Sequence, residues 1–254
     1  MKVTNTVMNI SFVIPAFNEE KYIGACLEGI LSCDKKLIHE VIVVNNGSTD
    51  GTDRIVRSYK ERLGSCLKLI DESRKGRVFA RKKGFEVASG DYIASIDADC
   101  RPNGKWLRTI CDYFECHPQT VCVSGPYLFY DLHASLKVFN ALKEFLFHFL
   151  LPYILPSERG QVWGGNFVAR REALKKAHGF STAFSSLGDD VNIERCLKKI
   201  GPVIFSTRFF IPSSARRINH EGAIYTFLRY RMNRYFQLLT GRLLFRVGLD
   251  KDWR

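Results

Sequence analysis

The chain has 254 residues, and its 38 lysines and arginines outnumber its 26 aspartates and glutamates, which gives a formal net charge of +12. Hydrophobic residues make up 46% of the chain and charged residues 25%, with 19 glycines and 8 prolines. These values exclude a disordered, collagen-like or low-complexity chain. They predict a basic globular protein, long enough for one large or two small domains.

The first 125 residues alternate between strand patterns and helix patterns. Short apolar runs that predict buried strands occupy residues 10–14, 41–44, 67–70 and 92–96. Apolar residues at helical spacing predict helices over residues 20–31, around 55–59 and over 78–87. Strands separated by helices favour right-handed crossovers, so we expect an α/β fold with a mainly parallel open sheet flanked by helices.

The alternation is less regular after residue 121. Apolar runs occupy residues 121–123, 162–169 and 203–206, and a helix is expected from Arg171. We expect one domain over residues 1–221, in which a second half of about 126–221 is built onto a first half of about 8–125. A basic segment of helical character, residues 222–254, would follow it.

The cysteines and the N-terminus bear on the cellular compartment. None of the eight cysteines is in a C-x-x-C pair or beside histidines at zinc-ligand spacing, so we interpret them as buried thiols in a reducing compartment. Residues 1–5 lead into the first strand pattern without the apolar block of a secretory signal. A cytoplasmic location is therefore expected.

Residues 145–155 form the most apolar stretch of the chain. This segment is shorter than the roughly 20 residues that a spanning helix needs, and Pro152 interrupts it. A core helix is the favoured interpretation, and a segment that rests on a membrane surface is the alternative.

Polar residues follow three of the predicted strands, at the edge where an open parallel sheet binds its ligands. Asp97 and Asp99 come directly after the strand over residues 92–96. Two carboxylates at the mouth of a pocket suit Mg²⁺ or Mn²⁺ shared with substrate phosphates. A solvated turn is the alternative interpretation.

The loop over residues 45–52 offers the Asn45 and Asn46 amides to a base or a ribose, although an ordinary turn fits as well. No strand is followed by Gly-x-Gly-x-x-Gly, and no P-loop pattern is present, which argues against dinucleotide redox chemistry and P-loop chemistry. A bound phosphate would then be held by metal and by arginine. Arg77 and Arg81 are the candidates, and a solvated basic helix face is the alternative.

Seven short motifs, in this order, resemble those of the family 2 glycosyltransferases with the GT-A fold. That family transfers a sugar from a nucleotide donor with inversion at the anomeric carbon. The motifs occupy residues 12–20, 41–52, 76–84, 90–93, 96–99, 163–166 and 188–190. The resemblance covers at least residues 10–200, and it implies a nucleotide-binding half followed by an acceptor-binding half.

The resemblance also implies roles for single residues. The nucleotide-sugar donor would be bound by Pro15, Ala16, Phe17, Glu19, Asn45, Asn46, Arg77, Arg81 and Asp97. Metal ligands would be Asp99 and Asp97, with His220 as a third, and contacts to the donor or acceptor sugar would come from Trp163, Gly164, Gly165, Asn166 and Asp189. Asp190 matches the family's general base, which takes the proton of the acceptor hydroxyl. The pair Asn45-Asn46 stands where the family usually has at least one aspartate, which argues against assuming uridine as the nucleoside.

The C-terminal segment is rich in positive charge, because residues 205–254 contain ten lysines and arginines against three acidic residues. Apolar residues recur at helical spacing from Ile224 to Leu243, and Arg231, Arg234 and Arg242 are expected on one side. Such a helix suits an anionic membrane surface, so a peripheral location on the inner face of the cell membrane is one expectation. Packing on the domain with a solvated basic side is the alternative.

Three other functions compete with transfer to a hydroxyl. A polyprenyl phosphate acceptor is already ionised and would need little help from Asp190. A non-enzymatic module could bind an anionic membrane or nucleic acid, although the four aspartates of the motifs would repel a phosphate backbone, so nucleic acid is not expected as a partner. A sugar nucleotidyltransferase is disfavoured because its Gly-rich loop is missing after the first strand.

Overall fold

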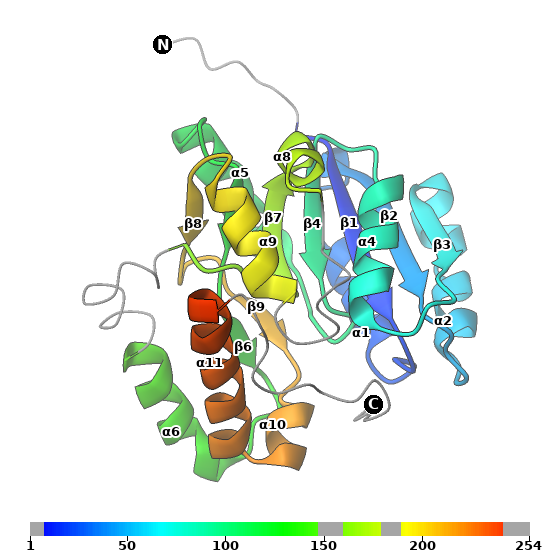
Figure 1. Ribbon diagram of the computed structural model, residues 1–254. Coiled ribbons are helices and arrows are strands. Elements are labelled where there is room, and N and C mark those ends of the chain that lie inside the picture. Colours follow the sequence, from blue (N-terminus) through cyan, green and yellow to red (C-terminus); the bar gives the residue numbers. More distant parts are fainter. Residues whose placement is uncertain (1–7, 147–159, 179–188, 241–254) are drawn as a thin grey trace.

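The computed structural model describes residues 8–146, 160–178 and 189–240. A seven-stranded sheet in the order β3-β2-β1-β4-β7-β5-β8 has helices on both faces, and β6 pairs with β9 in a second, two-stranded sheet (Figure 1). The strands are β1 (Ile10–Ala16), β2 (Ile38–Asn45), β3 (Leu67–Asp71), β4 (Tyr92–Ile96), β5 (Cys122–Ser124), β6 (Tyr127–Phe129), β7 (Asn166–Arg170), β8 (Val203–Phe205) and β9 (Ile211–Ser213).

The helices follow the predicted alternation in the first half of the chain. They are α1 (Ile23–Leu31), α2 (Thr52–Ser58), α3 (Lys60–Leu63), α4 (Arg77–Val87), α5 (Gly104–Cys116), α6 (Ala134–Phe145), α8 (Arg171–Lys176), α9 (Asp189–Lys198), α10 (Arg216–Glu221) and α11 (Ala223–Thr240), with short 3₁₀ turns at Lys35–Leu37 and Gly64–Cys66. None of the helices in the described ranges is long and apolar enough to cross a membrane.

The sheet is mainly parallel, which confirms the predicted fold class. β1 pairs in parallel with β2 and β4, β2 with β3, and β5 with β8. β7 differs, because it runs antiparallel between β4 and β5. Its first residue, Asn166, pairs with Ile96 at the carboxyl end of β4. The residues before β7 therefore lie beside the residues after β4.

Alternate residues of the strands pack into two separate cores, one on each face of the sheet. In β1, Phe12 faces a core built with α1, α2 and α5, whereas Val13 faces a core built with α4, α8 and α9. Helix α4 lies so close to β1 that a Cβ on Gly84 would come within 2.3 Å of Val13 Cγ1. A side chain at position 84 would therefore push α4 away from the sheet.

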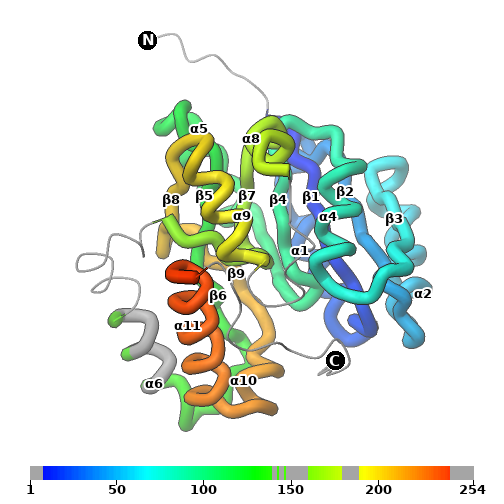
Figure 2. Tube along the Cα trace, in the orientation of Figure 1, coloured from blue at the N-terminus to red at the C-terminus, as the bar shows by residue number. Residues whose placement is uncertain are grey.

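The two predicted halves of the chain contribute strands to the same sheet. The tube in Figure 2 shows one continuous sheet, in which β7 of the predicted second half lies between β4 and β5 of the first half. The apolar segment 145–155 lies outside the described residues from 147 onward, and so do residues 241–254 of the predicted C-terminal helix. All eight cysteines are free thiols.

Candidate active site

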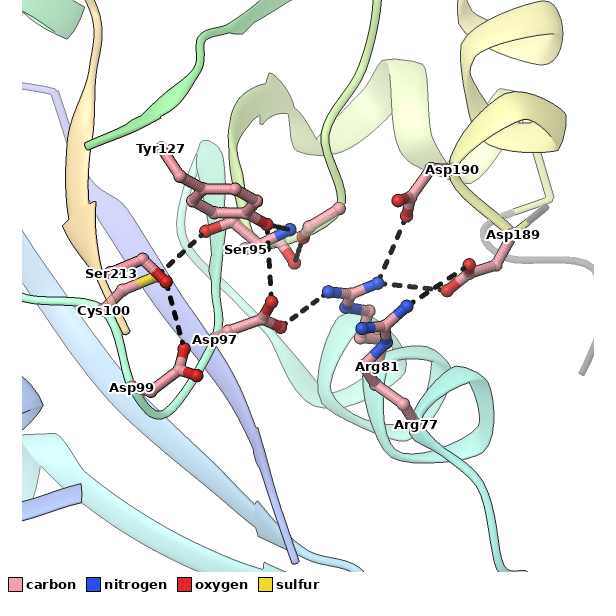
Figure 3. A network of polar contacts seen from close by, with 12 residues as sticks. Arg77, Arg81, Ser95, Asp97, Asp99, Cys100, Tyr127, Asp189, Asp190 and Ser213 are labelled. Carbon is pink, nitrogen blue, oxygen red and sulfur yellow. Dashed lines mark hydrogen bonds and ion pairs between the residues drawn. The ribbon is translucent and has the colours of Figure 1, made fainter. Parts of the chain in front are cut away.

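The loops that follow β1, β2 and β4 meet at one edge of the sheet, because the carboxyl ends of parallel strands point the same way. The antiparallel β7 adds the segment 163–165 to this edge. Helix α9 adds its first residues, Asp189 and Asp190 (Figure 3). Residues that are far apart in the sequence are thereby brought together where the fold is expected to bind ligands.

Arg81 of α4 joins the acidic side chains of this site (Figure 3). Its Nη2 donates to Asp97 Oδ1 at 2.7 Å, and its Nη1 lies 3.0 Å from Asp189 Oδ2 and 3.3 Å from Asp190 Oδ1. The Arg81 side chain is 1% exposed. One guanidinium therefore fixes the end of β4 relative to the start of α9, and a direct contact with a donor phosphate stays a prediction.

The carboxyl group of Asp190, the predicted general base, has a raised pKa. Removal from water raises the pKa of this carboxyl from 3.8 to about 6, and the adjacent Asp189 carboxylate acts in the same direction, against Arg81 and Arg77. The Asp190 side chain is 32% exposed, whereas Asp189 is buried. Arg77 Nη2 lies 3.7 Å from Asp189 Oδ1. The two aspartates thus differ: Asp189 is enclosed by arginines, and Asp190 is open to a substrate.

The glycines of the motif Trp163-Gly164-Gly165-Asn166 allow the backbone to pass directly against these charged groups. A Cβ on Gly164 would lie 2.0 Å from Asp190 Oδ1 and 2.3 Å from Arg81 Nη1. A Cβ on Gly165 would lie 2.2 Å from Asp97 Oδ2. Any side chain at either position would displace a carboxylate, so the glycines shape the site, and their predicted sugar contacts stay predictions.

The other two residues of this motif have different surroundings. Asn166 is 0% exposed; its Nδ2 donates to the carbonyls of Gly125, Pro126 and Phe209, and its Oδ1 accepts from Trp106 Nε1. This amide joins β7 to α5 and to the loops around Gly125 and Phe209, and its sugar contact stays a prediction. Trp163 is half-buried, with its ring 5.1 Å from the ring of Tyr127, and its sugar contact stays a prediction.

The carboxylate of Asp99 already forms an ion pair with an arginine. Its Oδ2 lies 3.0 Å from Nη2 of Arg216, and Ser213 Oγ lies 3.4 Å from its Oδ1. Arg216 also forms a fork with Glu19, at 2.8 and 2.7 Å. Mg²⁺ and Mn²⁺ prefer carboxylate oxygens as ligands, so the Asp99 and Asp97 side chains fit the predicted ion.

The described residues contain no group of three or more His, Cys, Asp or Glu side chains arranged to hold a metal ion. Two carboxylates from one turn would thus need further ligands from the substrate, as is usual for Mg²⁺. His220, the predicted third ligand, is exposed in α10, one turn after Arg216. Its role as a ligand stays a prediction.

The predicted nucleoside pocket consists of the ends of β1 and β2. Pro15 and Ala16 are the last, buried residues of β1, and Phe17 follows them half-buried. Asn45 Nδ2 donates to Asp71 Oδ1 at 3.1 Å, and Asn45 Oδ1 accepts from the Ser48 backbone N–H. The carboxylate that the asparagine pair lacks is therefore supplied next to it, by the last residue of β3.

Asn46 holds the loop that leads from β3 to α4. Its Nδ2 donates to the carbonyls of Glu72 and Arg74, each at 2.8 Å, and its Oδ1 accepts from the Gly76 backbone N–H. This loop ends where Arg77 and α4 begin. Asn46 is thus engaged by the backbone, and its contact with a base or ribose stays a prediction.

Three site residues were missed by the sequence analysis, namely Asp71, Tyr127 and Arg216. The Tyr127 hydroxyl accepts from the Gly165 N–H and lies 3.4 Å from Asp97 Oδ2. Burial raises the pKa of this phenol well above its usual value, and Asp97 adds to the effect. A position directly after a predicted strand was an available signal for Asp71, whereas Tyr127 and Arg216 reach the site through tertiary contacts that no local pattern indicates.

The comparisons with known proteins agree with this arrangement. The chain is 38% identical over 106 residues to glycosyltransferase AglE of Haloferax volcanii. The matched stretch covers 41% of this chain and 35% of AglE. It is 34% identical over 111 residues to dodecaprenyl-phosphate galacturonate synthase of Rhizobium johnstonii, which covers 42% of this chain and 33% of that protein. The chain thus spans about a third of the length of these curated relatives.

Among solved structures, a mannosyltransferase of Pyrobaculum calidifontis, in complex with GDP-Man and Mn²⁺, shares the fold. The TM-score is 0.70 at 20% sequence identity, over 94% of this chain and 66% of that chain. The model of the family described as glycosyl transferase family 2 matches residues 11–177, which is more than half of the chain. On this evidence the chain belongs to glycosyl transferase family 2.

Proposed function

We propose that the protein transfers a sugar, with inversion, from a nucleotide-sugar donor to a hydroxyl of a saccharide or lipid-linked acceptor. The observation that carries this proposal is the link between the donor side and the acceptor side of the site. Arg81 contacts both Asp97, beside the predicted donor position, and Asp190, the predicted base. Inversion requires a base on one side of the sugar and the leaving group on the other, and the Arg81 side chain contacts the predicted residue of each side.

Asp190 acts on the acceptor in this proposal. As the acceptor oxygen attacks the anomeric carbon, its proton moves to the Asp190 carboxylate, and the bond between that carbon and the nucleoside diphosphate breaks. Attack from the face opposite the leaving group inverts the configuration. A pKa of about 6 leaves most of Asp190 ionised at pH 7, while the carboxylate stays basic enough to take a proton.

The leaving group needs positive charge, and the proposal assigns this to a divalent ion held by Asp99 and Asp97. Such an ion, Mg²⁺ or Mn²⁺, offsets the charge that develops on the departing diphosphate. The Mn²⁺ in the Pyrobaculum complex supports the assignment. Pro15, Ala16, Phe17 and the Asn45–Asp71 pair would face the nucleoside, with Asp71 as the carboxylate available to a base or ribose hydroxyl.

The direct test is a panel of nucleotide sugars, assayed for transfer to hydroxyl acceptors and to polyprenyl phosphate, with wild type and Asp190→Asn. We expect the variant to lose about 10²- to 10⁴-fold in rate with a hydroxyl acceptor, because the proton has no base. Full activity of Asp190→Asn with a polyprenyl phosphate, together with no transfer to hydroxyls by wild type, would replace the proposal with the phosphate acceptor.

Helix α11 bears on where a lipid-linked acceptor binds. This helix packs with its polar side toward the domain, which leaves its apolar side exposed. Thr226, Asn233 and Gln237 are buried, the last at 1% exposure, and Arg234 forms an ion pair with buried Glu194 of α9 at 2.8 Å. The expectation that Arg234 shares an outer side with Arg231 is therefore wrong: a buried carboxylate binds it.

The outward side of α11 is apolar. Ile224, Tyr225, Leu228, Met232 and Leu239 are exposed at helical spacing, and Leu239 is 86% exposed. Helix α6 also exposes leucine and valine side chains, and Figure 1 draws it in the same part of the molecule. Of the three arginines of α11, Arg229 pairs with Glu221 and Arg234 with Glu194, so the apolar side chains provide most of this surface. We therefore propose that this side rests on an anionic lipid surface, where a lipid-linked acceptor is presented.

Vesicle sedimentation tests the membrane contact. Leu228→Asp combined with Leu239→Asp should lower binding to phosphatidylglycerol vesicles at least about tenfold, because two exposed apolar side chains that would enter the lipid are lost. Val87→Asp, at an exposed apolar position of α4, is the matched control and should bind as wild type does. Equal binding by the double variant and wild type would contradict the membrane proposal and leave the transfer proposal untouched.

A further inference from the structure

The guanidinium of Arg216 lies between two carboxylates that come from the predicted donor side of the site. Its Nη1 donates to Glu19 Oε2 at 2.8 Å, and its Nη2 lies 2.7 Å from Glu19 Oε1 and 3.0 Å from Asp99 Oδ2. Its face lies 4.4 Å from the centre of the Tyr22 ring. Arg216 thus makes a complete fork with Glu19 and a separate, single contact with Asp99.

Helix α10, which carries Arg216, has a second attachment. The Asp131 carboxylate accepts from the Ser214 hydroxyl at 2.6 Å and from the Ala215 N–H, and the Asp131 carbonyl accepts from Asn219 Nδ2 at 2.9 Å. The start of α10 is therefore fixed by Asp131, and its contact with the sheet edge is fixed by Arg216. Burial acts to lower the pKa of Arg216, but the carboxylates of Glu19 and Asp99 outweigh it and raise this pKa above its usual value.

A divalent ion on Asp99 would compete with this contact. Asp99 would then be shared by the ion and the guanidinium, and two cations so close would repel each other. Asp99 is 13% exposed, so solvent screens this repulsion poorly. Glu19 keeps both of its oxygens on Arg216, which leaves the arginine a binding partner when Asp99 is taken.

We propose that Arg216 is the resident cation of Asp99, which gives way to the divalent ion and then remains bound to Glu19. The inference rests on the proposed function, because the ion is the one that supports the donor diphosphate. Ion binding would release one of the contacts that hold α10 against the sheet edge. Metal occupancy and the position of the C-terminal helices would thereby be coupled.

The test uses the full chain and Mn²⁺ alone, with free Mn²⁺ measured by electron paramagnetic resonance. Arg216→Gln should bind Mn²⁺ at least about tenfold more tightly than wild type, because the competing charge is gone. Arg57→Gln is the control: it removes the same charge from an exposed position of α2, where the side chain pairs with Asp53. This control should change the affinity by less than about threefold.

Two further variants separate the possible failures. Glu19→Gln should weaken Mn²⁺ binding, because Arg216 then has only Asp99 to neutralise it; this opposite sign keeps the inference testable even if Arg216→Gln fails to fold. Asp99→Asn should abolish binding. Equal affinities of Arg216→Gln, Glu19→Gln and wild type, with binding lost in Asp99→Asn, would overturn the role of Arg216 alone. Unchanged binding by Asp99→Asn would overturn the metal site of the proposed function.

A second measurement reports on α10 itself. Amide hydrogen exchange over residues 216–221 should become faster when Mn²⁺ is added to wild type, since the Arg216 contact with Asp99 is lost. In Arg216→Gln the exchange should be fast from the start and insensitive to Mn²⁺. Unchanged or slower exchange in wild type on addition of Mn²⁺ would contradict the loss of the contact between Arg216 and Asp99.

Discussion

Replacement of Asp190 by asparagine tests the electrostatics of the site through protein stability, independently of any substrate. In the folded protein the pKa of Asp190 is raised from 3.8 to about 6, so the protonated form is favoured. Stability from this group is then complete below about pH 4 and is lost as the pH rises through about 6. The difference corresponds to at most about 3 kcal/mol of unfolding free energy.

Asp190→Asn resembles the protonated state, so it should be more stable than wild type at pH 7, by up to about 3 kcal/mol, and equally stable at pH 4. Urea unfolding at the two pH values measures the difference. Asp189→Asn is the control with the opposite sign, because it breaks a buried pair with Arg81 and should destabilise by about 3–5 kcal/mol. In the transfer assay, wild-type kcat/KM should rise with pH to a plateau above about pH 6. Two results together would refute the raised pKa of Asp190: Asp190→Asn is no more stable than wild type at pH 7, and wild-type kcat/KM does not change between pH 5 and 7.

Two other sets of variants test the geometry around Arg81. Arg81→Lys loses the fork that reaches three carboxylates, so it should lower the unfolding free energy by about 3–5 kcal/mol in urea titrations; a stable variant with full activity would contradict the linking role of this side chain. Gly164→Ala crowds Asp190 and should lower kcat about 10²-fold with little change in the donor KM. Gly165→Ala crowds Asp97 instead and should raise the donor KM, so identical effects of the two substitutions would contradict the separation of the two sides.

The parts of this fold that follow from local patterns could be predicted. Apolar runs separated by helical periods identified the parallel strands, and parallel strands place their following loops at one edge. The proximity of Asp97 to Asp190 was expected only through the family motifs, since 93 residues of sequence separate them. The direction of β7 was not predicted, because a short apolar run has the same pattern in either direction.

The contacts of polar residues with one another were harder to predict. Hydrophobic periodicity assigns the apolar side of a helix to the core, and α11 reverses this because buried Glu194 requires the charge of Arg234. The contact of Arg216 with Glu19 spans 197 positions of the sequence. Neither partner has a neighbouring residue that signals the other, so such ion pairs become visible only when the chain is folded.

The charges at the sheet edge predict that donor binding depends on a divalent ion. Five carboxylates lie there, and three arginines contact them: the acids are Glu19, Asp97, Asp99, Asp189 and Asp190, and the bases are Arg77, Arg81 and Arg216. With all five acids ionised, this set is negative, and a nucleoside diphosphate would add further negative charge. The arginines are already engaged by carboxylates, so they offer the diphosphate little free charge. Calorimetry with GDP and UDP should therefore show binding with Mn²⁺ and none in EDTA, and equal affinity in both buffers would mean that the arginines turn toward the diphosphate instead.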